Sequence, residues 1–210
     1  MPIYKILLGI AALFALYKMV IKKRVYLLGV FVVFIAILEI IAANFFSYYY
    51  ENNLIIYTII SYFSVFFYLV YFRIPKDSIK MYTVYILLFI FWQIFAIWNF
   101  IWGEGVENVN INTYNLGMII SIILIIQWFY RKLYIDNFEQ LFLNPKLYVG
   151  FGILIFYTCS FTILNFINYL IVDDNFKKIY SDLLKIGNIF LSLGYFGAIL
   201  CSIRKTYYTI

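Results

Sequence analysis

The chain has 210 residues, of which 66% are hydrophobic and only 12% are charged. A water-soluble domain is nearer one half apolar and one quarter charged, so this composition excludes an ordinary soluble domain and favours a membrane protein. The formal net charge of +6 would also suit a nucleic-acid-binding protein, but the sixteen Lys and Arg residues occur in short clusters between apolar runs. Such clusters are typical of the charges that orient a membrane protein, and we expect no nucleic acid as a partner.

Seven apolar stretches follow one another along the chain and leave no room for a soluble domain between them. A helix rises about 1.5 Å per residue and the hydrocarbon layer is about 30 Å thick, so each crossing needs roughly 20 apolar residues. The stretches that meet this requirement span approximately residues 3–20, 25–47, 53–73, 80–102, 111–132, 146–171 and 180–203. We therefore predict an all-α fold, a polytopic transmembrane bundle of seven helices, with residues 1–210 forming a single membrane domain.

The distribution of basic residues predicts the orientation of this bundle. If the N-terminus lies outside, twelve Lys and Arg residues fall on the cytoplasmic side and only four, Lys5, Lys177, Lys178 and Lys185, on the outer side. The positive-inside rule therefore favours an outer N-terminus and a cytoplasmic C-terminus. The apolar segment 9–16 is followed by Lys22-Lys23-Arg24 in place of a small-residue cleavage site, so we expect it to be retained as a helix.

Glu39 is the most unusual residue of the apolar stretches. It lies some eight residues inside the predicted outer end of the second helix, and Asn44 follows a little over one turn later. An ionised carboxylate in hydrocarbon costs several kcal/mol, so Glu39 must be protonated, face a wet cavity or meet a donor. Lys185, near the predicted outer end of the seventh helix, is the candidate partner. Glu39 either lines a ligand pocket or proton path or makes a structural contact between helices, and we favour the structural role.

A stripe of polar residues marks the sixth predicted helix. Thr158, Thr162 and Asn165 repeat at spacings of four and three, so they share one face, and Asn168 lies one turn further along. Such a face should point into the bundle. A cleft between the second, sixth and seventh helices would combine this face with three further polar residues: Glu39, Lys185 and Asn188. Simple hydrogen bonding between neighbouring helices is the alternative, and we favour it over a functional cleft.

Several familiar chemistries lack the residues they need. The chain contains no histidine, which removes the base of a serine intramembrane protease and the commonest metal ligand. No pair of aspartates lies deep within the predicted helices, as an aspartyl protease would require. Gln93, Asn99 and Gln127 receive less weight than the polar stripe as functional candidates. We therefore predict that the protein is not an enzyme and uses neither a metal nor a cofactor.

Several segments in the second half of the chain have a recognisable wording: Asn112-Thr113-Tyr114, Gln127-Trp128-Phe129-Tyr130, Leu143-Asn144-Pro145 and residues 150–161. They resemble a group of small bacterial seven-helix membrane proteins associated with two-component histidine kinase signalling, and residues 51–57 resemble that group's entry into its third helix. The resemblance implies a multi-pass protein of the bacterial inner membrane with a sensory or accessory role, and it assigns no ligand or catalytic residue. No kinase segment follows Ile210, so we expect any signal to pass to a separate partner protein through the cytoplasmic loops.

Two functions follow as hypotheses. The first is a non-enzymatic membrane sensor or accessory protein that passes a signal to a cytoplasmic or membrane partner. The second is an oligomeric ion channel or membrane-perturbing effector, such as bacterial defence systems use, in which Glu39 and the polar stripe line a pore. The sequence leaves homo-oligomerisation open, and it names neither a ligand nor a partner.

Overall fold

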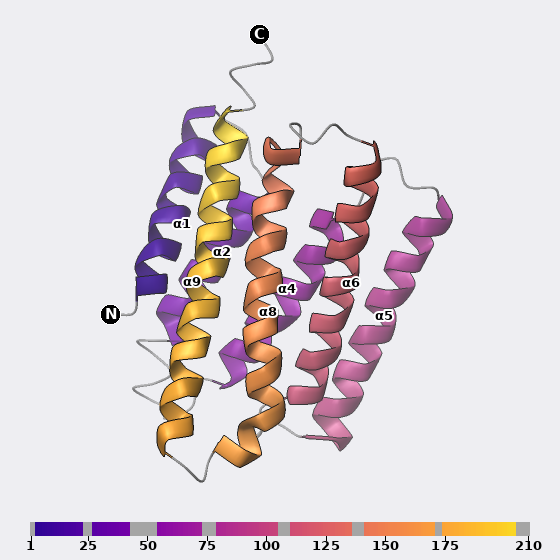
Figure 1. Cartoon of the computed structure of the whole chain (residues 1–210). Helices are drawn as coiled ribbons and strands as arrows, with labels where there is room; N and C mark the ends of the chain where they lie inside the picture. The colour runs from indigo at the N-terminus through magenta and orange to yellow at the C-terminus, as the bar shows by residue number, and fades with distance from the viewer. Residues whose placement is uncertain are drawn as a thin grey trace. The chain divides into compact units, whose positions relative to one another are not determined.

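The computed structural model of the chain describes residues 3–22, 27–42, 54–72, 79–104, 110–135, 141–170 and 174–204. These ranges contain seven long helices and no strand, which confirms the predicted all-α fold (Figure 1). The helices are α1 (Ile3–Lys22), α2 (Leu27–Ile41), α4 (Leu54–Phe72), α5 (Ile79–Trp102), α6 (Ile111–Ile135), α8 (Pro145–Leu170) and α9 (Asp174–Arg204).

The helix ends agree with the predicted stretches except at two places. The predicted second helix reaches residue 47, whereas α2 ends at Ile41 and residues 43–53 lie outside the described ranges. The last helix begins at Asp174, six residues before its predicted start at residue 180. A helix does not have to end where the apolar run ends, and acidic residues such as Asp174 are favourable at a helix N-terminus. Asp182 and Lys185 therefore lie well inside α9 and not at its beginning.

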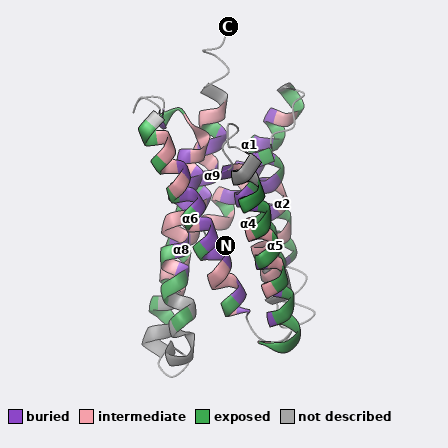
Figure 2. Cartoon of the chain, turned by 90° about the vertical axis from the view of Figure 1, so that its right-hand side faces the viewer, coloured by how far each residue is buried: buried purple, intermediate pink, exposed green. Residues whose placement is uncertain are grey.

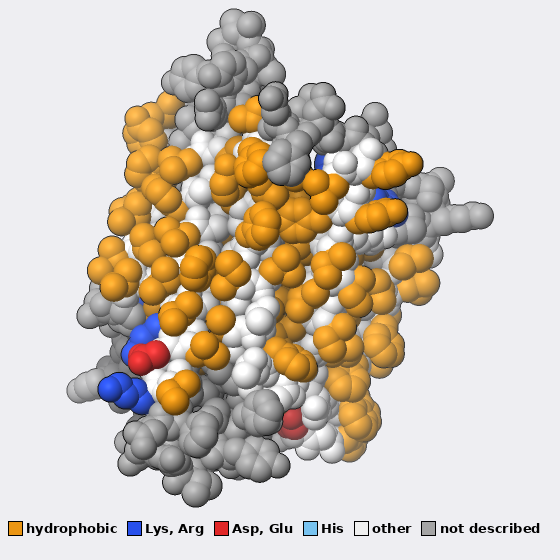
Figure 3. Space-filling view, viewed as in Figure 1, with side chains coloured by type: hydrophobic (Ala, Val, Ile, Leu, Met, Phe, Trp, Pro, Cys, Tyr) orange, Lys and Arg blue, Asp and Glu red, His pale blue; other side chains and the backbone are white. Residues whose placement is uncertain are grey.

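Four of these helices are long and apolar enough to cross a membrane. They are the segments Ile3–Ile21, Thr83–Trp102, Ile111–Tyr134 and Ser181–Ser202, while Leu27–Ile41 and Thr58–Phe72 are shorter apolar helices. Much of their apolar surface is uncovered: exposed residues run along α5, for example (Figure 2). The space-filling view shows hydrophobic side chains spread over the helices, with charged ones at only a few places (Figure 3). Apolar surface of this extent is typical of a protein surrounded by lipid.

The chain divides into two compact units, Met1–Ala36 with Phe129–Ile210, and Ile37–Trp128. In the first unit, α8 and α9 pack closely because glycines face one another. A Cβ atom on Gly194 would lie 2.7 Å from the carbonyl oxygen of Tyr148 and 3.1 Å from the Cα atom of Gly152. A Cβ on Gly187 would meet the Cβ of Cys159 at 3.2 Å. The small residues thus allow the two backbones to approach, as in other packed membrane helices.

The contacts of α9 also fix the direction in which its neighbours run. Gly194 lies beside Gly152, and Gly187 lies beside Cys159, so α8 and α9 are antiparallel. On α1, the carbonyl oxygen of Tyr4 accepts a hydrogen bond from Ser192 Oγ (3.3 Å), and Lys18 Nζ donates to Ser202 Oγ (2.7 Å). Later residues of α1 thus meet later residues of α9, so these two helices run parallel.

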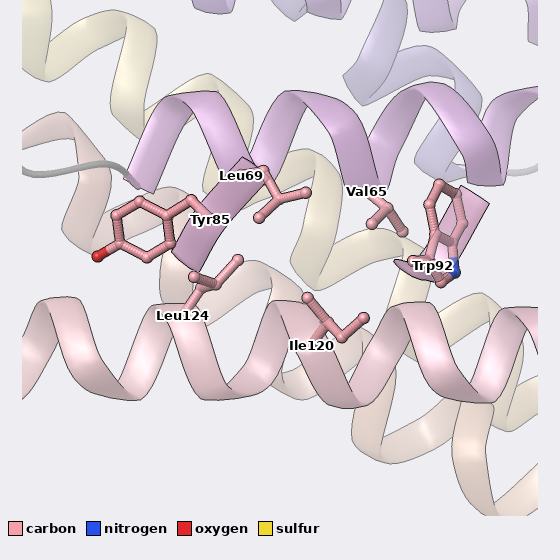
Figure 4. Packing of buried hydrophobic residues seen from close by; sticks show 6 residues of the cluster. All are labelled: Val65, Leu69, Tyr85, Trp92, Ile120 and Leu124. Carbon is pink, nitrogen blue, oxygen red and sulfur yellow. The ribbon is translucent and has the colours of Figure 1, made fainter. Parts of the chain in front are cut away.

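In the second unit, α4, α5 and α6 share a core of aliphatic and aromatic side chains (Figure 4). The core consists of Val65, Leu69, Tyr85, Trp92, Ile120 and Leu124. Side chains of α4 and α5 pack directly against the backbone of α6 at Gly117. A Cβ atom there would lie 2.8 Å from Val65 Cγ2 and 3.1 Å from Trp92 Nε1. The fully buried Trp92 therefore occupies space that any larger residue at position 117 would need.

Candidate functional site

Glu39 is half-buried in the last part of α2, and its Oε2 atom is enclosed by protein. Lys185, its predicted partner, forms an ion pair with Asp182 one turn earlier in α9, at 2.8 Å between Nζ and Oδ1. Both side chains of that pair are about half exposed (55% and 54%). The charge of Lys185 is thus met within its own helix, and the pairing of Lys185 with Glu39 remains a prediction. Asn44, the other predicted neighbour of Glu39, lies outside the described residues.

The polar stripe of α8 does not point into the bundle, so that expectation was wrong. Thr158, Thr162 and Asn165 are exposed, and each donates a hydrogen bond to a carbonyl oxygen four residues earlier in α8, at 2.8, 3.1 and 2.7 Å respectively. Short polar side chains can bond to their own helix in this way, so they need no neighbouring helix. Asn188 does the same in α9, with Leu184 O as acceptor at 2.9 Å, and the side chain of Asn168 lies outside the description.

The structure instead gathers polar groups where α5 ends and α6 begins. Asn99 lies in the last turn of α5, Glu104 follows that helix, Asn110 immediately precedes α6, and Thr113 lies in its first turn. Asn99 and Thr113 are 2% exposed and Asn110 is 7% exposed, so this cluster is almost closed to solvent. We call these four residues the Asn99 network. Asn99 received little weight from the sequence because its partners, at positions 104, 110 and 113, do not lie on the same helix as Asn99.

Asn99 is the centre of the network. Its Nδ2 atom donates to Glu104 Oε2 at 2.6 Å, to Thr113 Oγ1 at 3.0 Å and to Asn110 Oδ1 at 3.2 Å. An amide group has only two N–H hydrogens, so the three acceptors share them and hold the side chain in one position. Buried polar groups need such partners, because an unsatisfied one costs free energy. The network therefore joins the end of α5 to the start of α6.

Glu104 also caps the N-terminus of α6. Its carboxylate accepts a hydrogen bond from the backbone N–H of Asn112, at 3.3 Å to Oε1 and 3.2 Å to Oε2. The carbonyl oxygen of Asn110 accepts the first hydrogen bond within the helix, from Tyr114 N at 3.0 Å. The first backbone N–H groups of a helix have no partner within it, and the helix dipole favours a negative charge there. The sequence did contain a signal for the start of α6, since Asn, which stands at position 110, is a preferred residue just before a helix.

Small residues continue from the network into the core of the second unit. Thr113, Gly117 and Ser121 follow one another at intervals of four on α6, and all three are buried. The Trp92 Nε1–H donates to the carbonyl oxygen of Thr113 at 3.2 Å, and Ser121 Oγ donates to that of Gly117 at 2.8 Å. Small residues at this spacing allow membrane helices to pack closely. We interpret this face as a surface for helix packing.

Among the described side chains of the first unit, one that is charged is buried, that of Lys18. It is 5% exposed and donates from Nζ to Ser202 Oγ at 2.7 Å and to the carbonyl oxygen of Ile199 at 3.5 Å. These acceptors belong to the last turns of α9, where the helix dipole makes a cation favourable. Lys18 therefore ties the end of α1 to the end of α9.

The described residues contain no group of three His, Cys, Asp or Glu side chains close enough to hold a metal ion. Together, the fold and these polar clusters define the class: an all-helical protein with several apolar helices of membrane-crossing length, whose buried polar groups tie helix ends together. Comparisons with models of protein families, with curated proteins and with solved structures found no match in any of the three.

Proposed function

We propose that the chain is an integral membrane protein that crosses the bilayer seven times, with its N-terminus outside and its C-terminus in the cytoplasm. Four helices of sufficient length and the uncovered apolar surface support the membrane location. The parallel course of α1 and α9 supports an odd number of crossings, because the first and last of seven helices must run in the same direction.

The positions of charged residues in the first unit support the orientation. Lys18, Arg131, Lys132 and Lys146 lie near the C-terminal ends of α1 and α6 and the N-terminal end of α8, at the end of the unit where α9 finishes. This end is held together by the ring contact between Phe129 and Phe151 and by the packing of Tyr148 against Gly197. A cytoplasmic location of this basic end agrees with the positive-inside rule.

Cysteine labelling tests this topology on a background in which Cys159 and Cys201 are replaced by alanine. Lys178→Cys, exposed near the start of α9, should react with a membrane-impermeant maleimide on intact cells. Tyr134→Cys, exposed at the end of α6, should react only after the membrane is permeabilised. The reverse pattern would overturn the orientation, and labelling of both positions on intact cells would overturn the crossing between them.

As a function, we propose a non-enzymatic sensor or accessory protein of the bacterial inner membrane that passes a signal to a partner protein. One observation carries this proposal: the Asn99 network and Lys18, the main buried polar groups that the structure describes, connect helix ends to one another. The resemblance to small proteins associated with histidine kinases supports the same role. The connections between helices are short, so contacts with a partner would involve helix faces and the basic end of the first unit.

A channel is the second candidate, and the exposed stripe of Thr158, Thr162 and Asn165 favours it, because several copies could arrange such faces around a pore. Ion flux into liposomes, measured with the purified protein of known particle size in detergent, separates the two functions. We expect a small particle and no flux above that of protein-free liposomes. Flux that Glu39→Gln abolishes would establish the channel and refute the pure sensor.

A further inference from the structure

We propose that the connected ends of α6 and α8 bind the headgroup of an anionic phospholipid, with Arg131, Lys132 and Lys146 as the cations that attract its phosphate. This inference rests on the proposed membrane location of the helices. It adds a specific lipid partner and names the residues that recognise it.

The first observation is the arrangement of aromatic and basic residues at the end of α6. Tyr130 and Tyr134 are 70% and 84% exposed and lie one turn apart, so they share an outward face. Tyrosine is enriched where hydrocarbon meets the headgroup layer. Arg131 and Lys132 lie between them in sequence and are half-buried. The two cations are thus held at the level where lipid phosphates would lie.

The second observation is a third cation across from this pair, at the start of α8. The rings of Phe129, near the end of α6, and Phe151, near the start of α8, lie 5.3 Å apart between centroids, so these two helix ends lie close together. Lys132 is three residues beyond Phe129 on the same face of α6, and Lys146 is five residues before Phe151 on α8. Both lysines therefore lie on the side of the ring contact that leads into the connection between the two helices. At about 1.5 Å per residue both lysines lie beyond the ring contact, toward the same helix ends.

The third observation concerns the N-terminus of α8, where the helix begins with Pro145 and Lys146. The first turn contains no acidic residue, although the positive end of a helix dipole normally favours one. Asn144 caps the helix, with its Oδ1 atom accepting from Lys146 N at 3.1 Å. A cation at this position adds to the positive potential of the helix end, so an anion outside the helix is favoured there. A lipid phosphate combines that charge with an apolar tail that fits the exposed helix surface.

Lipid retention tests the proposal. The full-length protein is reconstituted in vesicles of equal parts phosphatidylcholine and phosphatidylglycerol, extracted in mild detergent, and its bound lipids are counted by native mass spectrometry. We expect the wild type to retain phosphatidylglycerol preferentially. Arg131→Gln combined with Lys132→Gln should lower the apparent affinity for that lipid roughly tenfold or more, because each cation near an anionic surface contributes to binding. Lys132→Arg keeps the charge and should retain the lipid.

The matched control is Lys5→Gln combined with Lys178→Gln, which removes the same charge from the opposite end of the first unit and should leave retention unchanged. Equal loss in this control would overturn the proposal, since it would indicate a general charge effect. Equal lipid retention by the wild type and by the variant with both Arg131→Gln and Lys132→Gln would also overturn the proposal. That result is expected if Asp136 and Glu139, which stand between α6 and α8 in the sequence, neutralise the cations. Failure of the protein to float with the vesicles would instead refute the membrane location itself.

Discussion

Replacing Gly194 with alanine should lower the free energy of unfolding by about 1–3 kcal/mol, the usual cost of overpacking a tight contact. The added Cβ atom would lie 2.7 Å from the backbone oxygen of Tyr148 and 3.1 Å from the Cα of Gly152. Both obstacles are backbone atoms, so no side-chain rotation can relieve them and α8 must move away from α9. Thermal unfolding in detergent, followed by circular dichroism, measures the effect.

Gly9→Ala is the matched control for this substitution. A Cβ on Gly9 in α1 has no atom within 4 Å, so the change adds no contact. Alanine is the better helix former by up to about 1 kcal/mol, and the variant should therefore be as stable as the wild type or slightly more stable. If Gly194→Ala and Gly9→Ala shifted the melting temperature equally, the close packing of α8 and α9 would be contradicted.

Replacing Asn99 with leucine should lower stability by about 2 kcal/mol, because it leaves polar groups without their donor in a closed site. Thr113 and Asn110, both nearly buried, would lose a hydrogen bond at 3.0 and 3.2 Å, and Glu104 would lose the shortest contact of the network. The side chains are similar in size, so the loss reports on hydrogen bonding. The midpoint of thermal unfolding measures it.

Asn165→Leu provides the comparison, since this asparagine is exposed on α8 and donates to a carbonyl of its own helix. Its removal should change stability by no more than about 0.5 kcal/mol. A double-mutant cycle of Asn99→Leu with Thr113→Val should show coupling, because the two side chains share a hydrogen bond. Strictly additive effects of these two substitutions would show that the Asn99 network does not hold α5 to α6.

Features that depend on a single segment of the chain were predictable from the sequence, whereas features that depend on contacts between distant segments were not. The helices were predictable within a few residues, since each depends on an apolar run of its own length, and α5 and α6 begin within a residue of their predicted starts. The start of α9 was missed because residues 174–179 are too polar to count as apolar, although they continue the helix. Helix propensity and membrane hydropathy are different properties, and the predicted start of this helix rested on hydropathy alone.

The direction of the polar side chains on α8 was predicted wrongly, because polarity alone does not reveal where a side chain points. Thr158, Thr162 and Asn165 share a face, as their spacing predicted, but the structure exposes that face. Conversely, Asn99 was given little weight, although it is buried and donates to Asn110 and Thr113. An i to i−4 hydrogen bond can satisfy a polar residue on any face of a helix, so a polar stripe does not identify the interior.

Composition and apolar run lengths alone determined that this is an all-helical protein suited to a membrane, since hydropathy and length are properties of each segment by itself. Only the tertiary structure decided which polar groups meet. Lys18 and Ser202 lie 184 residues apart in the chain, yet their side chains are 2.7 Å apart in space. A Cβ atom on Gly194 would meet backbone atoms of α8, whereas a Cβ on Gly9 would have no atom within 4 Å. Such differences depend on which backbone lies opposite, and that is set by the packing of helices distant in sequence.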